Sequence, residues 1–125
     1  ISRYIEQRAW RHQCGTLRAS FQFLERIRDE SGTQKIYQRL DRAPVDVHVY
    51  GAPGWTPQPE STITAHAGWN EDFLESWFVV YTPPDGGDSH AALLALEAGP
   101  TEWRGFWTYD RSRVEAIDEY IACNL

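Results

Sequence analysis

Two histidines are the residues of this chain best placed to do chemistry. His48 and His66 fall in neighbouring β-rich segments, and a carboxylate from Asp46, Glu97 or Asp72 would complete a site with them. Imidazoles beside carboxylates bind metal or haem, or transfer protons. Two histidines make an incomplete metal site, and polar side chains bonded across strands on a solvated sheet face are the alternative. We therefore assign neither a catalytic residue nor a metal ligand.

Aromatic side chains form a second set of candidates. Trp77 and Trp107 lie in strand-like segments rich in aromatic residues, and Arg104 lies among them. An aromatic stripe is typical of a core, but small-molecule pockets are also mostly apolar with a few placed polar groups. The planar guanidinium of Arg104 suits a carboxylate or phosphate, unless it pairs with Glu97 or Glu102.

The loop over residues 51–59, rich in Pro and Gly, carries Trp55, a large apolar group where loops usually carry polar ones. Trp55 either caps the core or lines a site as part of a lid. The ligand-binding residues predicted from the sequence are His48, Tyr50, Trp55, His66, Trp77, Glu97, Arg104 and Trp107.

Several functions are disfavoured by motif and composition. The chain has no glycine-rich phosphate loop, Gly-x-Ser-x-Gly elbow, His-Glu-x-x-His or calcium loop. A net charge of −6 disfavours contact with a nucleic-acid backbone. No apolar run approaches the ~20 residues that cross a bilayer, and the N-terminus does not resemble a secretory signal, so we expect a cytoplasmic protein. Cys14 and Cys123 are expected to be buried thiols, with a disulfide as the alternative if the terminal helices meet.

Hydrophobic periodicity defines the elements that must position these residues. It predicts helices over residues 2–13, 16–29, 33–42 and 110–123, and strands over residues 45–50, 62–66, 76–81, 91–97 and 103–109. For the last helix, Ser112 and Glu115 resemble a capping box, and Asp110 is an alternative cap. The predicted fold class is α+β: N-terminal helices, a five-stranded mostly antiparallel sheet and a C-terminal helix. It forms one domain over 1–125, divided into a helical segment 1–43, a sheet 44–109 and a helix 110–125.

The first predicted strand has two chemically different faces. Its valines alternate with Asp46, His48 and Tyr50. Helices must cover at least one face of the sheet, and the face that they cover decides whether His48 and Tyr50 line a pocket or meet solvent.

Four segments together resemble the DICT domain, a sensory module named for diguanylate cyclases and two-component systems. They are Phe21-Gln22 and residues 45–51, 76–80 and 103–110. The resemblance runs from about Thr16 to the C-terminus and is to the haloarchaeal form, with which an acidic, arginine-rich, nearly lysine-free composition agrees. It implies a cytoplasmic α+β sensory domain linked to a signalling output, and it transfers no ligand and no catalytic residue.

Three functions follow as hypotheses. The leading one is a non-catalytic sensory domain that encloses a small molecule or chromophore, of unknown identity, and relays the signal through its terminal helices to a partner or output domain. The second is a ligand-free interaction or dimerisation module that uses an exposed helix or sheet edge. The third is a small acid–base enzyme, which requires His48 or His66 in a cleft beside a carboxylate with a shifted titration.

Overall fold

A mixed six-stranded sheet with helices on both faces organises the chain. The computed structural model describes residues 2–24, 27, 31–69, 76–84, 89–99 and 102–124. The helices are α1 (Ser2–His12), α2 (Ser31–Asp41) and α4 (Arg111–Asn124). The strands are β1 (Thr16–Phe23), β2 (Asp46–Ala52), β3 (Thr64–Ala67), β4 (Ser76–Thr82), β5 (Ala91–Gly99) and β6 (Glu102–Thr108).

The strand order is β3-β2-β1-β4-β5-β6. β1, β2 and β3 run parallel to one another, whereas the pairs β1/β4, β4/β5 and β5/β6 are antiparallel. The sheet therefore has one strand more than predicted, and it is mixed. β1 and β2 can pair in parallel because α2 connects them, as a crossover between parallel strands requires, and the long loop over residues 53–63 makes the crossover from β2 to β3.

The additional strand is β1, where a helix over 16–29 was predicted, and that prediction is wrong over 16–23. Leu17, Phe21 and Leu24 have helical spacing, but Leu17, Ala19 and Phe21 alternate equally well as a strand. Tertiary pairing decides between the two, because β1 lies at the centre and pairs on both edges. The predicted division into a helical segment 1–43 and a sheet 44–109 is wrong for the same reason.

The other elements agree with the sequence analysis. α1, α2 and α4 confirm the remaining three helices, and β2 to β6 confirm the five predicted strands within a few residues. Asp110 is the cap of α4, since the Arg113 backbone N–H donates to Asp110 Oδ2 at 3.3 Å. Glu115 instead accepts from Arg111 Nε at 2.9 Å. Two connections fall largely outside the described residues: residues 70–75, whose sequence suits one or two turns of helix or an irregular link, and residues 83–88, whose Pro and Gly content predicts a turn.

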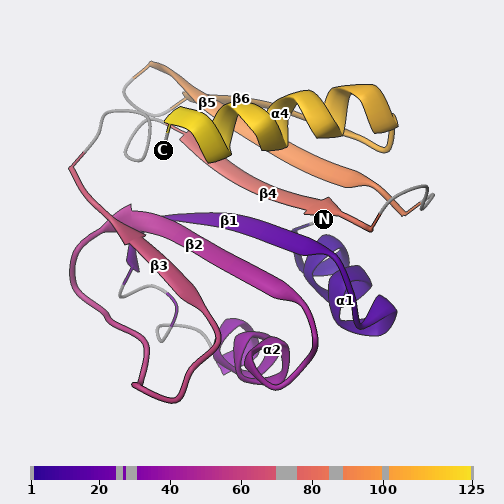
Figure 1. The fold of residues 1–125 in the computed structure, drawn as a ribbon. Coiled ribbons are helices and arrows are strands. Elements are labelled where there is room, and N and C mark those ends of the chain that lie inside the picture. The colour runs from indigo at the N-terminus through magenta and orange to yellow at the C-terminus, as the bar shows by residue number, and fades with distance from the viewer. Residues whose placement is uncertain are drawn as a thin grey trace.

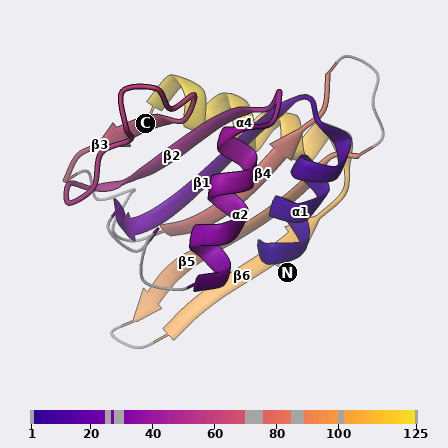
Figure 2. The same ribbon diagram turned by 90° about the horizontal axis from the view of Figure 1, so that it is seen from below.

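Helices cover both faces of the sheet. α1 and α2 lie on one face, and α4 lies on the other (Figures 1 and 2). The α1/α2 face carries the larger core, which includes Leu17, Val47, Val49, Val79 and Tyr81. The α4 face buries a smaller cluster, namely Tyr50, Phe78, Val80, Ala92, Val114 and Ile121. β2, β4 and β5 thus send alternate side chains into two separate cores.

The chain turns from α1 into β1 through two residues with left-handed backbone. Gln13 has a φ of 54° and Gly15 a φ of 91°. A Cβ at position 15 would lie 2.5 Å from the Thr82 carbonyl oxygen, so only glycine fits there.

The two thiols are free, and Cys123 is exposed, contrary to the prediction that both are buried. Among the described residues, no helix has the length and apolar character needed to span a membrane.

Candidate functional site

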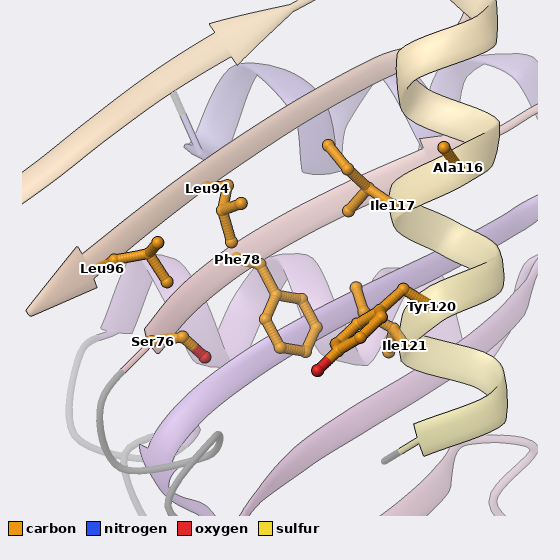
Figure 3. A pocket seen from close by; sticks show the side chains of 8 residues that line it. All are labelled: Ser76, Phe78, Leu94, Leu96, Ala116, Ile117, Tyr120 and Ile121. Atoms are coloured by element: carbon orange, nitrogen blue, oxygen red, sulfur yellow. The ribbon is translucent and has the colours of Figure 1, made fainter.

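A mostly apolar pocket lies between the sheet and α4 (Figure 3). Its volume is about 420 Å³, within the range of small-molecule sites. It is lined by Ser76 and Phe78 from β4, Leu94 and Leu96 from β5, and Ala116, Ile117, Tyr120 and Ile121 from α4.

The sheet positions the floor of this pocket by register. Ser76 pairs with Leu96, and Phe78 pairs with Leu94, so these four side chains share one face. The Phe78 backbone N–H donates to the hydroxyl of Ser20 at 2.8 Å, beyond the last residue pair of the β1/β4 ladder. This bond holds β4 against β1 where the strand ladder ends.

The chemistry of the pocket follows from its lining. No lining residue is charged, and the polar atoms of its side chains are the hydroxyls of Ser76 and Tyr120. Phe78 is fully buried at the floor, whereas Leu96 and Tyr120 are 53% and 56% exposed and mark the mouth. The pocket is therefore suited to an apolar body with few hydrogen-bonding groups.

A chain of polar side chains lies on the same face over β2 and β3. His48 Nε2 lies 3.0 Å from Asp46 Oδ2, and His48 Nδ1 lies 2.9 Å from His66 Nε2. The His66 ring stacks on Tyr50 with centroids 4.4 Å apart and planes 8° from parallel. Burial lowers the pKa of His66, and the nearby His48 and Arg18 lower it further.

Tyr50 connects this polar chain to both α4 and the pocket. Its hydroxyl accepts from Arg18 at 2.8 Å, and Arg18 Nε donates to Asp118 Oδ1 on α4 at 2.7 Å. The Tyr50 ring also contacts Phe78, the pocket floor, with centroids 5.6 Å apart. A displacement of Phe78 by a ligand would therefore reach Tyr50 directly.

The predicted residues do not form one site. His48, Tyr50 and His66 lie together, whereas Trp77 and Trp107 lie on the opposite, α1/α2 face, because they alternate with Phe78 and Phe106. The remaining three predicted residues are dispersed. Trp55 packs against the α1/α2 core, Arg104 shares the α4 face but lies at the far edge on β6, and the Glu97 side chain lies outside the described residues.

None of the eight residues that line the pocket was among the ligand-binding residues predicted from the sequence. Leu94 and Leu96 belong to a run that is apolar on both faces, so alternation gave no preferred face. Ala116 and Tyr120 are four residues apart on α4, and this helical spacing is the feature of the sequence that indicates a shared helix face. The described residues contain no group of three His, Cys, Asp or Glu side chains arranged to hold a metal ion.

Comparison with known proteins gives one match. The family model described as the sensory domain in diguanylate cyclases and two-component systems, DICT, matches residues 1–98. The match includes α1 and ends within β5, so it differs from the predicted extent at both ends. No curated protein and no solved structure matches the chain.

Proposed function

This chain belongs to the DICT family of sensory domains, and from that premise we propose that it detects a small molecule in the pocket between the sheet and α4. The bound molecule changes the packing of α4, and α4 relays the change to a signalling partner or an output domain in the cytoplasm. The module itself is non-catalytic.

The observation that carries this proposal is the pocket beneath α4. Four of the eight lining residues come from the helix and four from the sheet, so a ligand there contacts both layers. α4 has two buried residues, Val114 and Ile121, among those described. A helix with so few buried residues is stabilised measurably by a ligand that adds apolar contacts to it. The ligand thereby shifts the population toward the conformation in which α4 is packed on the sheet.

The histidines do not require an enzymatic interpretation. His48 meets the geometric condition for a general base, since it lies 3.0 Å from Asp46. However, neither histidine lines the pocket beneath α4. The polar chain is better explained as the link from Tyr50 to Arg18 and α4.

A ligand-free interaction module is the second candidate. Trp77 and Trp107 are 41% and 59% exposed on the α1/α2 face, and exposed aromatic groups are frequent at protein interfaces.

A matched pair of α4 variants tests the pocket. Both positions are exposed, but Ala116 lines the pocket and Ala122 does not, so Ala116→Trp places a large side chain at the pocket rim and Ala122→Trp places it elsewhere on the same helix. We expect Ala116→Trp to weaken binding of the neutral fluorescent probe N-phenylnaphthylamine by about tenfold or more, because the indole blocks the space that the probe enters. Ala122→Trp should bind the probe as the wild type does.

Circular dichroism of both variants controls for folding. Equal probe affinity in the two folded variants would contradict the pocket and favour the interaction module.

A further inference from the structure

We propose that the ligand of this pocket is an amphiphile with a carboxylate head, and that Arg104 binds that head at the pocket mouth. This inference rests on the proposed function, since it names the chemical class that the pocket takes. It follows from the cross-strand register of β5 and β6, the interactions of the arginines and the lining of the pocket.

Register places Arg104 beside the pocket mouth. Leu96 lines the pocket, is 53% exposed, and pairs directly with Arg104 across β5 and β6. Directly opposed residues of an antiparallel pair share a face, with Cβ atoms roughly 5 Å apart. A guanidinium at position 104 therefore borders the mouth that Leu96 and Tyr120 form.

Arg104 is available to bind an anion. It is exposed, and it makes no hydrogen bond or ion pair with any residue in the described part of the chain. The other arginine on this face of the sheet, Arg18, is held by Asp118 and Tyr50. On α4, Arg111 lies 2.9 Å from Glu115 and Arg113 lies 3.9 Å from Asp110.

One available guanidinium suits a singly charged head. Its fork matches the two oxygens of a carboxylate in a bidentate pair. α4 presents Glu115, Asp118 and Glu119, and the whole chain carries a net charge of −6, so a multiply charged head would meet repulsion.

The apolar surface continues from the pocket toward Arg104. Phe106 pairs with Leu94 on this face and is 44% exposed, so it extends the floor onto β6. The uncharged lining would not solvate a buried carboxylate, and the charged head must therefore lie outside the pocket. A straight alkyl tail in the pocket with its carboxylate at the mouth satisfies both requirements.

Decanoate and decanol test the head group, because they share a tail and differ in charge. Both are measured by displacement of the neutral probe. In the wild type at low salt, we expect decanoate to bind about three- to fivefold more tightly than decanol, a modest factor because Arg104 is exposed. High salt should shrink this preference.

Arg104→Gln should abolish the preference and leave decanol affinity unchanged. Arg11→Gln, at an exposed position of α1 on the other face, should retain it. Equal binding of the two compounds to wild type, or a preference that survives in Arg104→Gln, would overturn the head-group assignment while the pocket stands. If Ala116→Trp binds both compounds as the wild type does, the pocket itself, and with it the proposed function, is wrong.

Discussion

Their hydrogen-bond partners restrict how His48 and His66 can be protonated. A carboxylate only accepts hydrogen bonds, so His48 must donate to Asp46 through its Nε2–H. The contact between His48 Nδ1 and His66 Nε2 needs one further proton, which either ring can supply. Two doubly protonated rings would set two N–H groups against each other. The chain of bonds thus excludes the state in which both imidazoles are charged.

The lowered pKa of His66 predicts a pH dependence of stability. Its folded-state pKa lies below the ordinary value of 6.5, so the unfolded chain binds more protons at mildly acidic pH. This contribution to stability is complete above the unfolded pKa and is lost as pH falls through it toward the folded pKa. We expect the free energy of unfolding to fall between about pH 7.5 and about pH 5.5, and to fall less in His66→Gln than in wild type. Urea denaturation at each pH measures this free energy.

His12→Gln is the matched control, because His12 is exposed at the end of α1, outside the polar chain. The pH dependence of this variant should match wild type. If His66→Gln shows the same fall as wild type, the folded-state environment of His66 does not disfavour its protonation.

At the scale of elements, α4 is attached to the sheet by polar contacts as well as by its small apolar stripe. Arg18 and Asp118 form an ion pair whose side chains are 14% and 21% exposed. At the other end of the helix, buried His90 lies 3.2 Å from Glu115 through its Nε2. These contacts fix where α4 lies over the sheet, and they are the contacts that a shift of α4 would change.

The Arg18–Asp118 pair can be measured by a double-mutant cycle. Asp118→Asn should lower the free energy of unfolding by about 1–3 kcal/mol, less than for a fully buried pair, because both side chains keep some solvent contact. Arg18→Gln should cost a similar amount, and the double variant should cost less than the sum of the two.

Urea denaturation of the four proteins measures the coupling energy. Strict additivity would show that the pair does not attach α4 to the sheet. The control pair is Arg111 and Glu115, which lie in one helix and are about half exposed. Their coupling energy should lie near the lower end of the range for surface ion pairs.

At the scale of the molecule, the two helical layers are unequal. The core under α1 and α2 is larger than the core under α4, and central strands contribute to both. β6 lies at the sheet edge, and Arg104, Phe106 and Trp107 are all exposed there. The molecule therefore has a well-buried centre, and its less buried parts are the edge strand β6 and the helix α4 on one face of the sheet.

This inequality predicts the order of hydrogen exchange. Amides of β1 and β4 should exchange most slowly, whereas those of α4 and β6 should exchange through local opening at lower free energy. Saturation with N-phenylnaphthylamine should slow exchange in α4 selectively. Mass spectrometry of peptides after exchange measures both effects, and α4 peptides as protected as those of β1 would contradict the proposed mobility of α4.

The amino-acid sequence by itself determined most elements of this protein. Local periods specify which side chains share a face, because they are properties of the backbone of each element. The two-residue period does so in 45–50 and 76–81, and the 3.6-residue period does so in 110–123. The sequence also put His48 and Tyr50 on one face of a strand and His66 on a neighbouring strand, and the structure brings the three side chains into contact.

Only the tertiary structure decided the identity of β1 and the place of the pocket. Residues 16–23 fit both a helix and a strand, and pairing with β2 and β4 selects the strand. Leu94 and Leu96 became pocket residues because α4 packs over their face, and Arg104 lies beside Leu96 because β6 pairs with β5 in one register. Such contacts join residues distant in the chain, so no local period encodes them.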